Sequence, residues 1–281
     1  MMASLQLGIG LLFIVPLWLL GLRTPPKLTM ADLHSMILPA LMHALGQMVT
    51  VASLGAGSIA LVNAVKSIEP LSTAAASAIL FGDVLPWQVN VCLLPIVAGV
   101  ALASSADHQP FNRECCIYAM ASNIFFSLRG VLSKRALTAF PAEKALDAAN
   151  FLSVLTALAF LLTLPFALAF EGPKLGVEWH KAVTVGHQPP PPTTLLLRII
   201  LAGASFHLYN EASFHALNLV HPLTHAVGNA AKRPLLVLYS VVRGGALVRV
   251  PAAAGSALAV SGLILYALTK RVYAEPRRHD Q

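Results

Sequence analysis

Four basic side chains lie inside segments of this chain that are apolar enough to cross a membrane: Lys66, Arg129, Lys232 and Arg233. An Arg or Lys at the centre of a membrane-spanning helix costs about 2.5 to 3.5 kcal/mol on insertion scales. Two carboxylates in the same kind of segment, Glu69 and Glu211, can offset only two of these four charges. The remaining positive charge predicts a pocket within the membrane that suits an anion.

Lys66 and Glu69 are three residues apart, so on a continuous helix they share one face and partly neutralise each other. Pro70 follows and is expected to bend the chain just past them. Two interpretations stay open. In one, Lys66 and Glu69 form an internal ion pair that holds two helices together. In the other, Lys66 binds an anion while Glu69 orients it or gates access.

Lys232 and Arg233 are adjacent and therefore point about 100° apart on a helix. If the helix ends near Ala231, which Pro234 permits, both side chains can extend to the membrane surface. Otherwise the planar fork of an Arg beside the compact charge of a Lys suits phosphate oxygens approached from two directions. The second interpretation makes this pair part of a phosphate site.

The hydroxyls of Thr50 and Tyr209 stand in otherwise apolar runs. Taken alone, each is more simply a satisfied hydroxyl of the helix bundle than a ligand. Arg129 is predicted to form a structural or gating bridge to Glu69 or Glu211, in preference to contacting a substrate directly.

The chain has no Gly-rich phosphate loop, nucleophile elbow or paired catalytic carboxylates, so the sequence predicts that it is not an enzyme and needs no cofactor. Four histidines of the apolar runs are scattered and lack metal-binding spacing: His43, His207, His221 and His225. The cysteines also lack it and are expected to pack in the core: Cys92, Cys115 and Cys116. No metal site is expected.

Apolar runs of spanning length must position these side chains. The 281 residues are 57% hydrophobic and only 11% charged, which predicts an all-α polytopic membrane protein. We count nine runs, at about 2–22, 34–54, 57–81, 86–106, 115–134, 147–170, 194–219, 221–244 and 250–269. The net charge of +7 lacks a basic stripe with interleaved aromatic residues, so a nucleic-acid partner is not expected.

Three blocks resemble the plastid phosphate translocators of the drug/metabolite transporter superfamily, and together they extend over nearly the whole chain. Val65-Lys66-Ser67-Ile68-Glu69-Pro70 with the following Ala74-Ala75-Ala76-Ser77 is similar to the family's IKxxEP segment and its AAAS. Residues 122–134 resemble the SNISFxxRxxxSKK block. Tyr209-Asn210 and residues 222–233 resemble YNQ…PLTHAVGNxxKR, nearly residue for residue.

The resemblance implies a bundle of ten helices in two inverted repeats, with both termini in the stroma. The family's first helix and transit peptide have no counterpart, so Met1 begins in the equivalent of the second helix and about nine spans are expected. This points to a fragment or an incorrectly assigned start. We expect an N-terminal repeat at 1–138, a C-terminal repeat at 139–272, and a basic polar tail at 273–281.

Carried over by position, the family's phosphate ligands fall on Thr50, Lys66, Tyr209, Lys232 and Arg233. Gln47 occupies a position where triose-phosphate members have a histidine that contacts the substrate, and Pro234 replaces an aliphatic residue. These departures bear on which substrate is bound.

The sequence therefore predicts an antiporter that exchanges triose phosphate, or a related three-carbon phosphate ester, for inorganic phosphate by alternating access. The expected membrane is the inner envelope of the plastid, with the Golgi or another endomembrane as the alternative. Two other functions stay open: a carrier of nucleotide sugars or other organic anions from the same superfamily, or a truncated member that does not transport.

Overall fold

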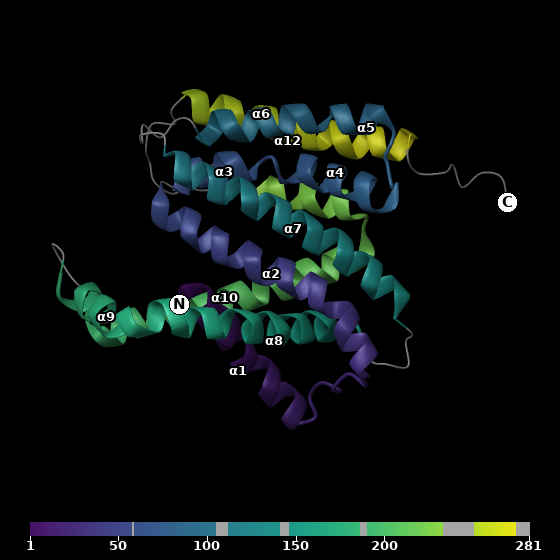
Figure 1. The fold of residues 1–281 in the computed structure, drawn as a ribbon. Helices are drawn as coiled ribbons and strands as arrows, with labels where there is room; N and C mark the ends of the chain where they lie inside the picture. The colour runs from purple at the N-terminus through teal and green to yellow at the C-terminus, as the bar shows by residue number, and fades with distance from the viewer. Residues whose placement is uncertain (58, 105–111, 141–145, 186–189, 233–249, 274–281) are drawn as a thin grey trace. The chain divides into compact units, whose positions relative to one another are not determined.

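The structure is a computed structural model, and it describes all residues except 58, 105–111, 141–145, 186–189, 233–249 and 274–281 (Figure 1). Within the described residues the secondary structure is entirely helical, as predicted. The α-helices are α1 (Met2–Leu19), α2 (Met30–Ala56), α3 (Ile59–Lys66), α4 (Glu69–Phe81), α5 (Trp87–Val91), α6 (Leu93–Ser104), α7 (Arg113–Ala139), α8 (Ala148–Phe166), α9 (Leu175–Thr184), α10 (Pro192–Leu219) and α12 (Val250–Tyr273). Residues 222–232 are also helical.

Four stretches of described helix are long and apolar enough to cross a membrane by length and composition: Met2–Leu19, Met30–Ala56, Arg113–Ala139 and Ala148–Thr184. The last of these joins α8 to α9 through a π-helical turn at Ala167–Glu171 and a 3₁₀ turn at Gly172–Lys174. The fold class predicted from the composition, an all-α polytopic membrane protein, is thus confirmed, while the number of nine spans stays a prediction.

The chain divides into two compact units, each built from two separate parts of the sequence. The first unit contains Met1–Met48 and Leu132–Leu219, and the second contains Val49–Val131 and Val220–Gln281. This division shows which segments pack together and does not test whether the sequence consists of two repeats. The repeats expected at 1–138 and 139–272 therefore stay a prediction. Of the tail expected at 273–281, all but Tyr273 lies outside the described residues.

The first unit is built around α1, α8 and α10, which pack against one another. Its largest buried cluster includes Phe151 and Leu155 of α8 and Phe214 of α10, each at most 1% exposed. The ammonium of Lys134 donates to the carbonyls of Leu217 and Asn218 at 3.0 and 2.5 Å. These carbonyls belong to the last turn of α10, where a helix has no further N–H groups to satisfy them and where a cation is favourable.

In the second unit, α6 and α12 lie side by side (Figure 1). They approach so closely that a Cβ on Gly99 would lie 2.4 Å from the backbone nitrogen of Ala259. Close approach of two helix backbones at small residues is the usual way in which membrane helices pack. The buried core beside this contact includes Ile96 of α6 and Tyr266 of α12.

Two of the predicted apolar runs are broken into two helices, and both breaks have the same cause. A proline has no N–H and its ring clashes with the carbonyl four residues earlier, which kinks a helix or ends it. Accordingly, α3 ends at Lys66, four residues before Pro70, and α5 ends at Val91, four residues before Pro95. The expectation that Lys66 and Glu69 share one continuous helix is therefore replaced by a break at residues 67–68.

Candidate functional site

The ammonium of Lys66 lies against two hydroxyls from different helices of the second unit. It donates to Ser122 Oγ of α7 at 2.5 Å and to Thr50 Oγ1 of α2 at 3.2 Å. The two hydroxyl oxygens are themselves hydrogen-bonded at 2.7 Å. Because α3 ends at Lys66, the cation also lies at the negative end of that helix dipole, where positive charge is favoured. The structure thus brings together two of the predicted phosphate ligands, Thr50 and Lys66.

Helix α7 supplies further contacts to the end of α3. Asn123 Nδ2 donates to the carbonyl of Val65 at 2.7 Å, which fixes the backbone next to Lys66. The ring of Phe126 lies one turn further along α7, with its centroid 5.0 Å from Lys66 Nζ and 4.8 Å from the guanidinium carbon of Arg129. Both separations are within the range of cation–π attraction. Arg129 is 6% exposed.

Glu69 is the first residue of α4, where a carboxylate is favoured by the helix dipole. Its Oε1 accepts from Asn229 Nδ2 at 3.4 Å, and its backbone carbonyl accepts from the Thr73 hydroxyl at 2.9 Å. Asn229 lies in the helical residues 222–232, so Glu69 connects α4 to that helix. A role in gating or ion pairing stays a prediction for Glu69 and for Arg129.

The remaining predicted ligands lie elsewhere in the chain. Lys232 is exposed at the end of the helical residues 222–232, and Arg233 lies outside the described residues. Tyr209 is on α10 in the first unit and is 41% exposed. Gln47 is also in the first unit, 4% exposed, and donates to Gln6 Oε1 at 2.5 Å. Direct substrate binding by Tyr209, Lys232 and Arg233 stays a prediction.

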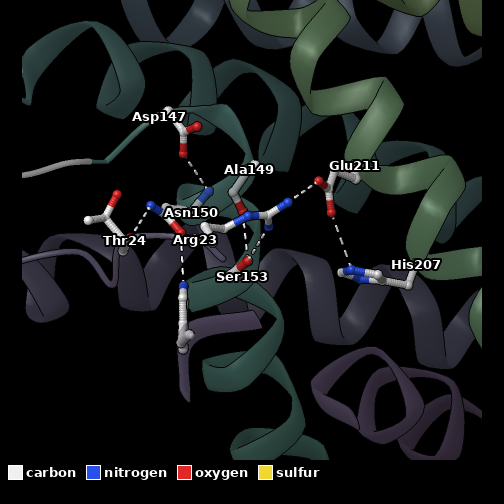
Figure 2. A network of polar contacts seen from close by, with 9 residues as sticks. Arg23, Thr24, Asp147, Ala149, Asn150, Ser153, His207 and Glu211 are labelled. Carbon is white, nitrogen blue, oxygen red and sulfur yellow. Dashed lines mark hydrogen bonds and ion pairs between the residues drawn. The ribbon is translucent and has the colours of Figure 1, made fainter. Parts of the chain in front are cut away.

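Glu211 of α10 is held between two bases in the first unit (Figure 2). Its Oε1 lies 2.5 Å from Arg23 Nη2, and its Oε2 lies 3.3 Å from His207 Nε2. Arg23 reaches this place because the chain reverses after α1: Gly21 adopts a φ of 67°, and the Arg23 N–H returns to the carbonyl of Leu17 at 3.0 Å. His207 is 4% exposed and lies one turn before Glu211 on α10.

The same network attaches the connection after α1 to the start of α8 (Figure 2). Asn150 accepts from Trp18 Nε1 at 3.0 Å and donates to the carbonyl of Thr24 at 2.9 Å. The side chain of Asp147 caps α8 by accepting from the Asn150 N–H at 2.8 Å. The sequence predicts Glu211 as a possible partner of Arg129. The structure shows two other partners of Glu211, Arg23 and His207, which the sequence did not predict.

A cavity of about 240 Å³ lies between α4, α5 and residue Leu223 in the second unit. Its polar lining includes Ser77, Asn90 and the pair of His221 and Asp83, whose Nε2 and Oδ2 are 2.7 Å apart. Its lining, as far as the described residues show it, holds no Lys or Arg, so its chemistry is less suited to an anion than the surroundings of Lys66. Among the described residues, no group of three or more His, Cys, Asp or Glu side chains is arranged to hold a metal ion.

Sequence reasoning did not single out Ser122 or Asn123 as functional residues. Two adjacent polar side chains inside the apolar run 115–134 were the available signal, because such side chains are expected to face a partner helix in a membrane. The identity of that partner, the end of α3, depends on how the helices pack.

Comparison with known proteins gives a consistent result. A model of the Triose-phosphate Transporter family matches residues 1–267. The chain is 34% identical to phosphoenolpyruvate/phosphate translocator 2 of Arabidopsis thaliana, over 97% of this chain and 70% of that protein. It is 32% identical to the triose phosphate/phosphate translocator of non-green plastids from Brassica oleracea var. botrytis, over 97% and 66%.

It is also 34% identical to the xylulose 5-phosphate/phosphate translocator of Arabidopsis thaliana, over 95% of this chain and 62% of that protein. The chain therefore spans about two thirds of the length of these relatives. A protein of known crystal structure has the same fold, with a TM-score of 0.64 over 98% of this chain and 88% of that one, at 18% identity.

The family model and the three translocators match nearly the whole chain, and the three translocators exceed 30% identity. Four helical stretches have the length and composition expected of membrane spans. The chain belongs to the Triose-phosphate Transporter family, whose members are transporters and not enzymes.

Proposed function

We propose that this protein is an antiporter that exchanges a three-carbon phosphate ester for inorganic phosphate by alternating access. The observation that carries the proposal is the cluster of Lys66, Thr50 and Ser122, in which an ammonium and two hydroxyls from three helices meet within 3.2 Å. Ammonium and hydroxyl donors are the groups that bind phosphate oxygens. Tyr209, Lys232 and Arg233 are the other residues that we propose to bind the substrate.

Triose phosphate is the substrate that we propose first. The PLTHAVGN segment at 222–229 favours it, and several relatives are named for triose phosphate. Other relatives are named for phosphoenolpyruvate and xylulose 5-phosphate at similar identities. Because each of these compounds carries a phosphate group on a short carbon chain, a competition panel of the three determines the preference. The chloroplast relatives also support a plastid location, and we propose the inner envelope.

Exchange, as opposed to one-way transport, follows from the cost of closing an empty site. Removing a cation from water costs several kcal/mol unless an opposite charge replaces the lost solvation. A bound phosphate dianion supplies that charge, so the loaded carrier reorients more readily than the empty one. Glu69, Arg129 and Glu211 are proposed to take part in this gating through charge pairing.

The test is reconstitution of the purified protein in liposomes. Uptake of labelled phosphate is expected to require phosphate or triose phosphate inside the vesicles. Equal uptake into empty vesicles contradicts the exchange mechanism, and uptake that none of the three phosphate esters inhibits contradicts the substrate class.

The same vesicles test the proposed ligands. Lys232→Ala and Arg233→Ala are each expected to abolish exchange while the amount of folded protein stays close to that of the wild type. Lys181→Ala is the matched control, because Lys181 is an exposed lysine of α9 that pairs with Glu178. Normal exchange by both site variants removes the pair from the proposed site.

A further inference from the structure

Ser122 occupies the centre of the cluster around Lys66. Its hydroxyl oxygen lies 2.5 Å from the Lys66 ammonium and 2.7 Å from the Thr50 hydroxyl, and the side chain is fully buried. The bond to Lys66 is shorter than the one from Lys66 to Thr50, at 3.2 Å. Of the contacts that these three residues make with one another, those of Ser122 are therefore the shortest.

The neighbours of Ser122 on α7 act on the same part of α3. Asn123 holds the backbone of Val65, and Phe126, one turn after Ser122, faces the ammonium of Lys66. Residues i and i+4 lie on one face of a helix. Together, Ser122, Asn123 and Phe126 of α7 therefore restrain both the main chain and the side chain at the end of α3, and they restrict the freedom of a long, flexible lysine.

We propose that Ser122 is a positioning residue for transport: its hydroxyl holds the Lys66 ammonium and the Thr50 hydroxyl in the arrangement that receives the phosphate group. This inference rests on the proposed function. A lysine side chain loses rotamer entropy when it is fixed, and a site that fixes it in advance binds its ligand more tightly. The contribution of Ser122 is therefore expected in substrate affinity and not in the rate of reorientation.

The experiment measures phosphate exchange in proteoliposomes for Ser122→Ala, Ser122→Cys and Ser122→Thr. Removing a hydrogen bond to a charged group is expected to raise the KM for phosphate about tenfold, with the maximal rate per carrier changed less than about twofold. Ser122→Cys has the same side-chain shape with a somewhat larger atom and offers only a weak acceptor, so it is expected to behave like Ser122→Ala. Ser122→Thr keeps the hydroxyl and is expected to restore the wild-type KM.

Ser133→Ala is the matched control. Ser133 is also on α7 and fully buried, and its hydroxyl makes no hydrogen bond within the described part of the chain. The KM of Ser133→Ala for phosphate is expected to equal that of the wild type. If Ser122→Ala does not fold, Ser122→Cys provides the measurement.

An unchanged KM in both Ser122→Ala and Ser122→Cys overturns the inference. A lowered KM also overturns it, because it means that Ser122 competes with the anion for Lys66. If Ser122→Thr raises the KM for phosphate as much as Ser122→Ala does, the inference is also overturned, because the hydroxyl is then not what positions Lys66. Wild-type vesicles that exchange no phosphate contradict the proposed function itself, which separates that failure from the failure of the role of Ser122.

Discussion

Lys66 and Glu211 are ionisable side chains in apolar helices, and the structure gives them different surroundings. Lys66 donates to the hydroxyls of Thr50 and Ser122, which carry no charge. Glu211 lies between the guanidinium of Arg23 and the imidazole of His207. An ammonium next to two hydroxyls places together the kinds of groups that bind phosphate oxygens, whereas a carboxylate next to a guanidinium forms an ion pair. At the residue scale, Lys66 therefore fits substrate binding. Glu211 connects α10 to the segment after α1 by charge pairing, the kind of interaction proposed above to take part in gating.

The Arg23–Glu211 pair is expected to contribute to stability. Both side chains are only about one fifth exposed, at 21% and 20%, so removing one leaves a poorly solvated charge behind. Arg23→Ala and Glu211→Ala are each expected to lower the free energy of unfolding by about 3 kcal/mol. The double variant is expected to lose clearly less than the sum of the two, by on the order of 1 kcal/mol or more. The free energy of unfolding of all three variants is measured by thermal unfolding in detergent.

The control for this cycle is the pair of Glu178 and Lys181 on α9, which are 62% and 58% exposed. Glu178→Ala is expected to change the free energy of unfolding by no more than about 1 kcal/mol, because exposed ion pairs contribute little. If Glu211→Ala is as mild as Glu178→Ala, or if the two changes in the cycle simply add, Arg23 and Glu211 are not energetically coupled.

At the scale of the helix, prolines decide where the apolar runs are interrupted. Pro70 and Pro95 each end a helix four residues earlier, whereas Pro16, Pro39 and Pro165 lie inside helices. The break before Pro70 matters most for function. It places Lys66 at the end of α3, where the helix dipole favours its charge and α7 contacts it.

The contact of α6 with α12 depends on the absence of a side chain at Gly99. In Gly99→Ala the new methyl group would meet backbone atoms of Gly255 and Ala259 at 2.6 and 2.4 Å, so the two helices must move apart. We expect a loss of about 1 to 3 kcal/mol in the free energy of unfolding, measured by thermal unfolding in detergent.

Gly55→Ala serves as the comparison, since Gly55 is also helical but a Cβ there meets no atom of the described residues within 4 Å. Its stability is expected to stay the same or to rise by up to about 1 kcal/mol, because alanine favours helix more than glycine does. Equal stability of the Gly99 and Gly55 variants contradicts the close approach of α6 and α12.

At the scale of the whole molecule, the proposed phosphate binding and the proposed transport can be tested separately. A ligand that binds only the folded state stabilises it by about 2.7 kcal/mol at one hundred times its dissociation constant. Phosphate is therefore expected to raise the unfolding temperature in detergent, while chloride at equal ionic strength is expected not to. Stabilisation without exchange in liposomes indicates a member of the family that binds but does not transport. An unfolding temperature that phosphate does not change contradicts a phosphate site.

Much of the architecture was predictable because it depends on local composition. The runs at 2–22, 34–54 and 194–219 coincide with α1, α2 and α10 to within a few residues. The two runs broken at residues 67–68 and 92 were predicted as continuous. Hydropathy averages over a whole run, so it does not distinguish a proline that ends a helix from one that lies inside it.

The sequence by itself determined that the chain is a helical membrane protein and that Lys66 is a candidate ligand for an anion. Both conclusions follow from the cost of placing each residue in a hydrocarbon environment, and that cost is a property of the residue and its near neighbours. Only the tertiary structure decided which side chains these charged residues contact. Ser122 is 56 residues from Lys66, and Arg23 is 188 residues from Glu211. Contacts over such distances depend on which helix faces pack together, and nothing in the local sequence fixes that.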